Sequence, residues 1–102
     1  MNFLMENIKT IKLIDYGESF GARVVGIKIF KEVIDIFKND PSVIIVFDFE
    51  NISIISTGFA KELFGSLFKY LGANFTKRVK FKIQENKEII SSAILRGINS
   101  IK

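Results

Sequence analysis

The longest apolar run of the chain lies near its middle, at residues 43–49, and reads Val-Ile-Ile-Val-Phe-Asp-Phe. Apolar residues occupy six of its seven positions and do not alternate with polar ones. In a strand with one solvent-exposed face, apolar and polar residues alternate, whereas in a strand covered on both faces they do not. The run therefore predicts a buried central strand with parallel neighbours.

Apolar residues at helical spacing occur on both sides of this run. They predict three helices, at about residues 20–38, 58–71 and from 87 onward. Ser19 and Asn86 are suitable N-terminal caps for the first and third helix, and Gly72 is a suitable C-terminal end for the second. Each helix has one apolar stripe, so each is expected to pack against a common core.

Two shorter segments, at residues 8–14 and 79–84, have the pattern of further strands. In the second, apolar residues alternate strictly with polar ones, and Lys80 and Lys82 share one face. That face must meet water, which places the strand near an edge of the sheet. Strands and helices thus alternate along the chain, which predicts an α/β fold with right-handed crossovers. We expect one domain over residues 1–102, with a loosely ordered start at residues 1–7.

The amino-acid composition limits the kinds of catalytic and metal-binding site that the chain can form. The chain of 102 residues contains no cysteine and no histidine. This removes disulfides, thiolate ligands, the commonest metal ligand and the usual general base near neutral pH. We therefore expect no enzymatic activity, no metal site and no cofactor. No apolar run approaches the roughly 20 residues that span a bilayer, and no secretory signal is visible, so a cytoplasmic protein without membrane association is expected.

The net charge of +4 is concentrated in one short segment. Residues 77–87 contain five basic residues and one acidic residue, while the rest of the chain is balanced. Such a basic strip is usually a solvated edge that resists aggregation, although lysines near aromatic residues also occur in nucleic-acid-binding surfaces. Phe81 points to the opposite side of its strand from Lys80 and Lys82, which disfavours nucleic-acid binding.

A short polar loop, residues 53–58, connects the central strand to the second helix and ends in Ser56, Thr57 and Gly58. In the simplest interpretation one hydroxyl caps the helix. A helix N-terminus also favours anions, so Ser56 and Thr57 are candidate phosphoacceptors as well. The sequence leaves both interpretations open.

Residues 48–67 resemble a known family of regulatory domains. The loop is similar to that of the STAS domains of anti-sigma-factor antagonists, which reads Asp-Ser-Ser/Thr-Gly at this point. The segment is closer to a STAS-like family of unknown function, in which a hydroxyl pair precedes the pattern Phe-x-x-Glu-x-Phe-Gly-x-Leu. In this chain that pattern is Phe59, Glu62, Phe64, Gly65 and Leu67.

The resemblance implies a single STAS-like domain with a mixed central sheet covered by helices. It also implies a non-catalytic, bacterial signalling module that binds a protein partner, such as a histidine-kinase-like ATPase that acts as its serine kinase. Ser56 matches the phosphorylated serine of the antagonists. Asp48 matches an aspartate at the end of the central strand, where it would fix the loop by hydrogen bonds.

Small and apolar residues next to the loop suggest a docking surface. Gly65 is costly inside a helix unless something approaches it closely, and Val24 and Ile27 lie outside the apolar stripe of the first helix. We expect a partner, or a second copy of the chain, to bind around Phe59 as the aromatic anchor. The predicted contact residues are Gly58, Phe59, Glu62, Gly65 and Ser66. The alternative is a small-ligand or nucleic-acid-binding domain that uses the 53–58 loop or the 77–87 strip.

Overall fold

The computed structural model describes residues 7–17, 22–84 and 87–101, with the side chain of Lys87 excepted. The caps predicted at Ser19 and Asn86, and most of the N-terminal segment expected to be loosely ordered, lie outside these residues. The strands are β1 (Ile8–Lys12), β2 (Ile44–Asp48) and β3 (Val79–Lys82). The α-helices are α1 (Arg23–Asn39), α2 (Thr57–Ala60), α3 (Ser66–Leu71), α4 (Phe75–Arg78) and α5 (Lys87–Asn99). Turns of 3₁₀-helix span Leu13–Tyr16 and Gly72–Asn74, and a π-helical turn spans Lys61–Gly65.

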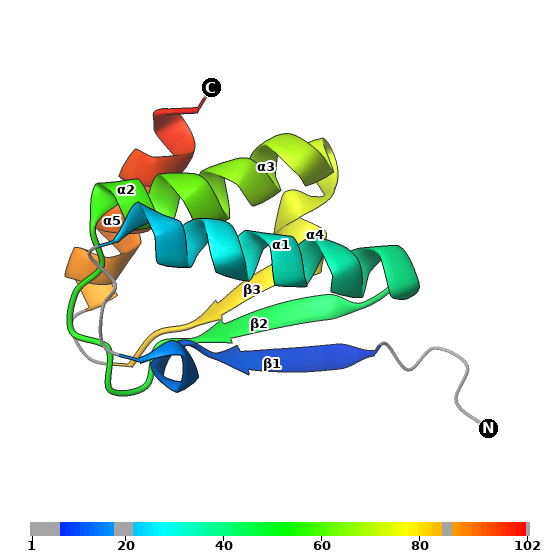
Figure 1. The fold of residues 1–102 in the computed structure, drawn as a ribbon, viewed down its shortest axis with the longest axis horizontal. Coiled ribbons are helices and arrows are strands. Elements are labelled where there is room, and N and C mark those ends of the chain that lie inside the picture. The colour runs from blue at the N-terminus through cyan, green and yellow to red at the C-terminus, as the bar shows by residue number, and fades with distance from the viewer. Residues whose placement is uncertain (1–6, 18–21, 85–86, 102) are drawn as a thin grey trace.

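The three strands form one parallel sheet in the order β1-β2-β3 (Figure 1). The predicted α/β class and the central position of the 43–49 run are confirmed, and β3 is an edge strand as its alternation indicated. The sheet is not mixed, however, because every described strand pair is parallel. Each connection between strands contains a helix long enough to return the chain to the same end of the sheet.

All the helices lie on one side of the sheet (Figure 1). Ile45 and Phe47 of β2 face them and are fully buried. On the other face, Thr10, Lys12, Lys80 and Lys82 are exposed on the two outer strands. The expectation that β2 would be covered on both faces is confirmed by its burial, because Ile44 and Asp48 on the second face are buried as well. That second face is flanked by the side chains of the neighbouring strands and not by helices.

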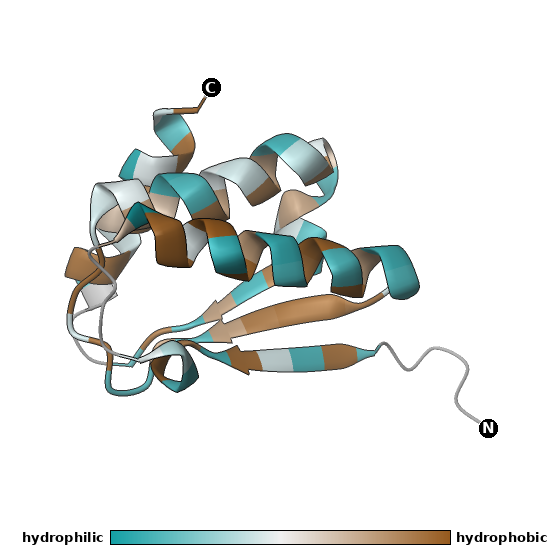
Figure 2. Cartoon of the chain, in the orientation of Figure 1, coloured by the Kyte–Doolittle hydropathy of each residue, from teal (hydrophilic) through white to brown (hydrophobic). Residues whose placement is uncertain are grey.

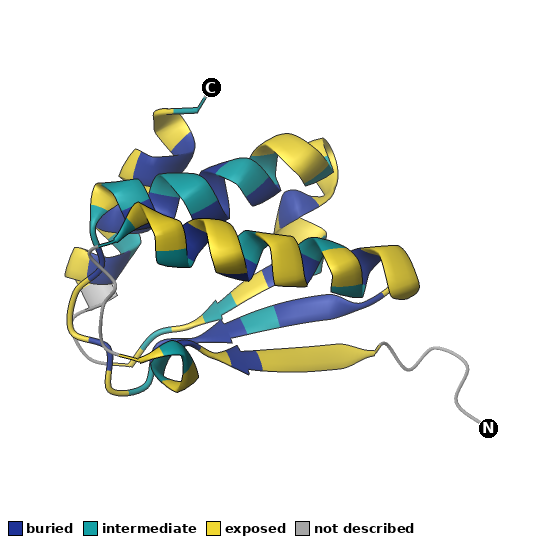
Figure 3. Cartoon of the chain, in the orientation of Figure 1, coloured by how far each residue is buried: buried dark blue, intermediate teal, exposed yellow. Residues whose placement is uncertain are grey.

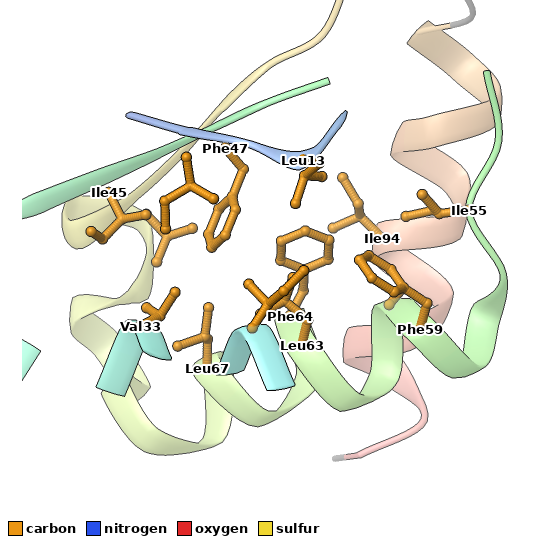
Figure 4. Close-up of a cluster of buried hydrophobic side chains, with 14 of the residues drawn as sticks. Leu13, Val33, Ile45, Phe47, Ile55, Phe59, Leu63, Phe64, Leu67 and Ile94 are labelled. Carbon is orange, nitrogen blue, oxygen red and sulfur yellow. The ribbon is translucent and has the colours of Figure 1, made fainter. Parts of the chain in front are cut away.

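Hydropathy and burial follow this one-sided architecture. β2 is apolar along most of its length, whereas β1 contains both apolar and polar residues (Figure 2). α1 is buried on the side that faces the sheet and exposed on its outer side (Figure 3). The core between the layers is rich in aromatic rings. Phe64 packs edge-on against Phe47 at 5.1 Å between ring centroids (Figure 4) and against Phe81 at 5.2 Å. Such edge-to-face pairs stabilise beyond the area that they bury.

α2, the π-helical turn and α3 form one continuous helix, residues 57–71, because the residues at both junctions keep helical backbone angles. This 57–71 helix ends at Gly72, which has a φ of +58° and confirms the predicted end. It lies between α1 and α5, and glycines allow both contacts. A β-carbon at Gly26 of α1 would lie 2.7 Å from the carbonyl oxygen of Phe59, and one at Gly97 of α5 would lie 2.5 Å from the carbonyl carbon of Ala60.

Two ionisable side chains outside the core have shifted pKa values. Hydrogen bonds from the amide of Asn7 and from Ser42 hold the pKa of Asp40 below its usual value. Asp40 thereby ties the start of β1 to the turn between α1 and β2. Burial, reinforced by the neighbouring Glu32, raises the pKa of Tyr16, whose hydroxyl donates to Glu32 at 3.2 Å. Tyr16 thus joins the 3₁₀-helical turn to α1.

Replacement of Ile45 by alanine should lower the free energy of unfolding by about 2–5 kcal/mol, because it removes a fully buried side chain beneath the helices. Ile8 lies on the neighbouring strand with 65% of its surface exposed, so Ile8→Ala should change stability by no more than about 0.5 kcal/mol. Urea denaturation of both variants measures the difference. Equal losses would contradict the one-sided core.

Gly97→Ala should destabilise the domain by about 1–3 kcal/mol, because the added methyl group would meet the backbone of Ala60 and Lys61. In a helix with free space at that position, the same substitution would stabilise by about 1 kcal/mol. Ser92→Ala, at an exposed position of α5, is the matched control and should be neutral or slightly stabilising. An increase in thermal stability for Gly97→Ala would show that α5 does not approach the 57–71 helix so closely.

Candidate functional site

The 53–58 loop is held to the domain by two buried isoleucines, Ile52 and Ile55. Ser56 follows in an extended conformation, and its hydroxyl oxygen accepts a hydrogen bond from the backbone N–H of Phe59 at 3.0 Å. The capping role that the sequence left open is therefore observed for Ser56. Between the two isoleucines, Ile54 is 68% exposed and forms an apolar tip on the loop.

Thr57 has a different environment from Ser56. Its side chain is exposed, and its Oγ1 accepts a hydrogen bond from Nε of Arg96 at 3.3 Å. Arg96 lies on α5, which packs alongside α2. The structure thus places a guanidinium group next to the more accessible of the two predicted hydroxyls.

A second arginine lies close to the same helix start. Nε of Arg23 donates to a carboxylate oxygen of Glu62 at 3.0 Å, and Nη2 contacts the same oxygen. The aliphatic part of Arg23 lies over Gly58, where a β-carbon would come within 2.7 Å of its Cγ. Gly58 and Glu62, both predicted to bind a partner, are thus already in contact with α1 of the same chain.

Phe59 is not available as a docking anchor. It is fully buried and contacts Phe64 edge-on at 6.3 Å between ring centroids (Figure 4). Gly65 is also buried, and α5 supplies the close approach that its position required, since a β-carbon there would lie 2.8 Å from the carbonyl oxygen of Gly97. The predicted roles of Phe59 and Gly65 in binding a partner are therefore wrong, because the chain's own helices occupy those faces. Ser66 is half-buried.

Asp48 makes the kind of hydrogen bond expected of a loop-fixing carboxylate. It is 3% exposed, and its Oδ1 accepts from the backbone N–H of Glu50 at 2.9 Å. Asn51 follows with a φ of +65°, a left-handed conformation that asparagine tolerates. Lys82 approaches the second oxygen of Asp48 at 3.9 Å. Asp48 thereby connects β3 to the turn that leads into the 53–58 loop.

The basic strip is partly engaged within the domain. Arg78 donates to the carbonyl oxygen of Val43 at 2.8 Å, and its guanidinium lies 4.7 Å from the ring centre of Phe37. The ammonium group of Lys80 donates to the carbonyl oxygen of Thr76 at 2.7 Å. Phe81 faces the core, as its position in the alternation predicted. Because Phe81 lies on the opposite side of β3 from Lys80 and Lys82, it cannot stack on bases beside them, which weakens the alternative of a nucleic-acid-binding strip.

Sequence reasoning missed Arg96 as a site residue. Arg96 carries no local signal, because only the packing of α5 against α2 brings it to Thr57. In the part of the chain that the structure describes, no group of three or more acidic side chains is arranged to hold a metal ion. The helices within residues 7–17, 22–84 and 87–101 also include none that is long and apolar enough to cross a membrane.

Comparison with known proteins gives one match. The model of the family described as STAS-like domain of unknown function (DUF4325) matches residues 25–90, which is more than half of the chain. The matched segment contains most of α1 and all of β2, the 57–71 helix and β3. No curated protein and no solved structure matches this chain.

Asp48→Ala should lower the free energy of unfolding by about 1–3 kcal/mol, because it leaves the N–H of Glu50 without its acceptor. Asp48→Asn keeps an acceptor oxygen at the same place, so its loss in the free energy of unfolding should be less than half that of Asp48→Ala. Chemical denaturation of the two variants measures the difference. If both variants were as stable as the wild type, the carboxylate would have no role in fixing the loop.

Proposed function

Because this chain belongs to the STAS-like domain family of unknown function, we propose that it is a regulatory protein-interaction module switched by phosphorylation at the start of the 57–71 helix. The proposal combines the family's resemblance to anti-sigma-factor antagonists with the environment of the two hydroxyls. In this proposal the domain is a bacterial, cytoplasmic protein and has no catalytic activity of its own. It is the substrate of a separate kinase, for which a histidine-kinase-like ATPase is our candidate.

The observation that carries the proposal is the pairing of the exposed Thr57 hydroxyl with Arg96. A kinase would transfer the terminal phosphoryl group of ATP to Oγ1, and the hydroxyl proton would pass to a base of the kinase as ADP leaves. A phosphothreonine carries about −1.5 to −2 charges and strong acceptor oxygens. The guanidinium of Arg96 can donate to them in the forked geometry that phosphates favour.

Thr57 is the acceptor that we favour over Ser56. The hydroxyl of Ser56 already accepts from the N–H of Phe59, so modification there would disturb the helix cap. Phosphorylation of Thr57 leaves that hydrogen bond in place and puts the new charge in the first turn of the helix, where the helix dipole favours an anion. Ser56 remains the second candidate, since it matches the antagonists' serine.

The switch would act on the surface around the loop. Ile54 projects into solvent near the two hydroxyls and can serve as an apolar contact for a partner. A phosphate at Thr57 would add negative charge beside this contact and would accept hydrogen bonds from the guanidinium of Arg96. A partner that docks on the unmodified loop would then be repelled or reoriented. A second copy of the chain is another candidate for that partner.

The proposal is tested on full-length protein purified from its native host, by mass spectrometry of the peptide that contains residues 53–58. We expect a phosphate on Thr57 in part of the population, and its loss in Thr57→Val, which removes the hydroxyl while keeping the side-chain shape. Thr10→Val, at an exposed position on β1, is the matched control and should leave the modification unchanged.

A second measurement separates a switch from incidental modification. Thermal unfolding of the phosphorylated protein should occur at a higher temperature than that of the unmodified protein, because the phosphate gains charge-assisted hydrogen bonds. Arg96→Gln should abolish this difference. Absence of phosphate from residues 53–57 under every growth condition would overturn the proposal.

A further inference from the structure

An apolar groove of about 410 Å³ lies between β3 and α5. Phe81 and Ile83 line it from the strand side, Leu95 and Ile98 line it from α5, and Phe68 and Phe75 are also part of its lining. Leu95 is 58% exposed, so an apolar side chain stands at the rim in contact with water. The volume lies within the range of protein binding pockets, about 300–1,000 Å³.

The groove runs along an unpaired strand edge. In the described sheet β3 pairs with β2 alone, and Figure 1 shows it on the side of the sheet away from β1. The carbonyl of Lys82 accepts from the N–H of Phe49, so the backbone groups of Lys82 point toward β2. Because these directions alternate along a parallel strand, the N–H and C=O groups of Phe81 and Ile83 point outward. They offer donors and acceptors to another strand.

The two faces of this edge differ in chemistry. Side chains of an added strand that point toward the helices would enter the apolar groove. Those that point the other way would lie beside Lys80 and Lys82, which are both exposed. Opposite charges on neighbouring strands stabilise a sheet and like charges destabilise it. The edge therefore matches a segment in which apolar and acidic residues alternate.

We propose that the outer edge of β3 and this groove form a docking site for an extended segment of another protein, whose side chains alternate between apolar and acidic. Such a segment would add a fourth strand to the sheet, with backbone hydrogen bonds giving affinity and the groove and lysines giving specificity. A second copy of this chain does not fit, because pairing two β3 edges would bring lysines together. The site lies apart from Thr57 and does not depend on its phosphorylation.

The first test selects binders from a displayed library of random peptides of about twelve residues, enough to span a strand, using the full chain as bait. We expect enriched peptides that alternate apolar and acidic residues. Leu95→Lys should weaken their binding about tenfold or more, whereas Val24→Lys, which changes a side chain with nearly the same exposure on α1, should not. Lys80→Glu should weaken binding and Lys31→Glu, on the outer face of α1, should not.

The second test identifies strand addition itself. Hydrogen exchange, measured by NMR on the complex with an enriched peptide, should show slowed amides at Phe81 and Ile83. The amides of Lys80 and Lys82 already point toward β2 and serve as the internal reference. Thr57→Val should leave peptide binding unchanged, so that failure of this proposal and failure of the phosphorylation proposal are distinguishable.

Several outcomes would overturn the docking site. These are a selection that yields no binders, binders without acidic residues, and binders that are insensitive to both Leu95→Lys and Lys80→Glu. Binding that Leu95→Lys abolishes but that leaves the amides of Phe81 and Ile83 exchanging freely would also overturn it. That result would mean that the peptide occupies the groove without adding a strand to the sheet.

Discussion

The close approach of three helices is the constraint on which the candidate site depends. Gly26 and Gly97 bring the backbones of α1 and α5 against the 57–71 helix from two sides, and Gly65 contributes a further contact to α5. A side chain at any of these positions would force the helices apart, because protein interiors have few spaces that could absorb the added volume. The same contacts hold Arg96 beside Thr57 and Arg23 over Gly58. The charged groups around the helix start are thus arranged by residues that have no side chains themselves.

The sheet supplies the fixed base for this arrangement. On its inner face Phe47 and Phe81 contact each other, and both contact Phe64 of the 57–71 helix. The outer face of the sheet is not covered by a second layer of helices. Long polar side chains of the strands and of the following turn lie over it instead. Lys12 approaches Glu50 at 3.8 Å and Lys82 approaches Asp48 at 3.9 Å, so the stems of these residues shield part of β2 from water. A parallel sheet thereby persists with helices on one face alone.

The amino-acid sequence predicted the features that local patterns determine. The unbroken apolar run identified β2, the alternation identified β3 as an edge, and Gly72 marked the end of the second helix. Prediction from the sequence failed where a residue's role depends on which helix packs against it in the folded domain. Phe59 lies at the edge of the apolar stripe and Gly65 outside it, and the pattern shows only that something covers them. Whether the rest of the chain or a partner does so is decided by tertiary packing, and the pairing of Thr57 with Arg96 has the same origin. The expected mixed sheet came from the family resemblance and not from the residues.

The π-helical turn at Lys61–Gly65 has a consequence for how the length of this segment can vary. Such a turn holds one more residue than a turn of α-helix, yet the helix on either side keeps its direction. Deleting one residue elsewhere in the 57–71 helix would rotate everything beyond it by about 100° and turn the buried face toward water. Deleting one residue within the turn would restore ordinary α-helical spacing and leave both flanking faces in place. This turn is therefore the position in the helix where the loss of a single residue is best tolerated, and it coincides with the contacts made by Gly65 and Gly97.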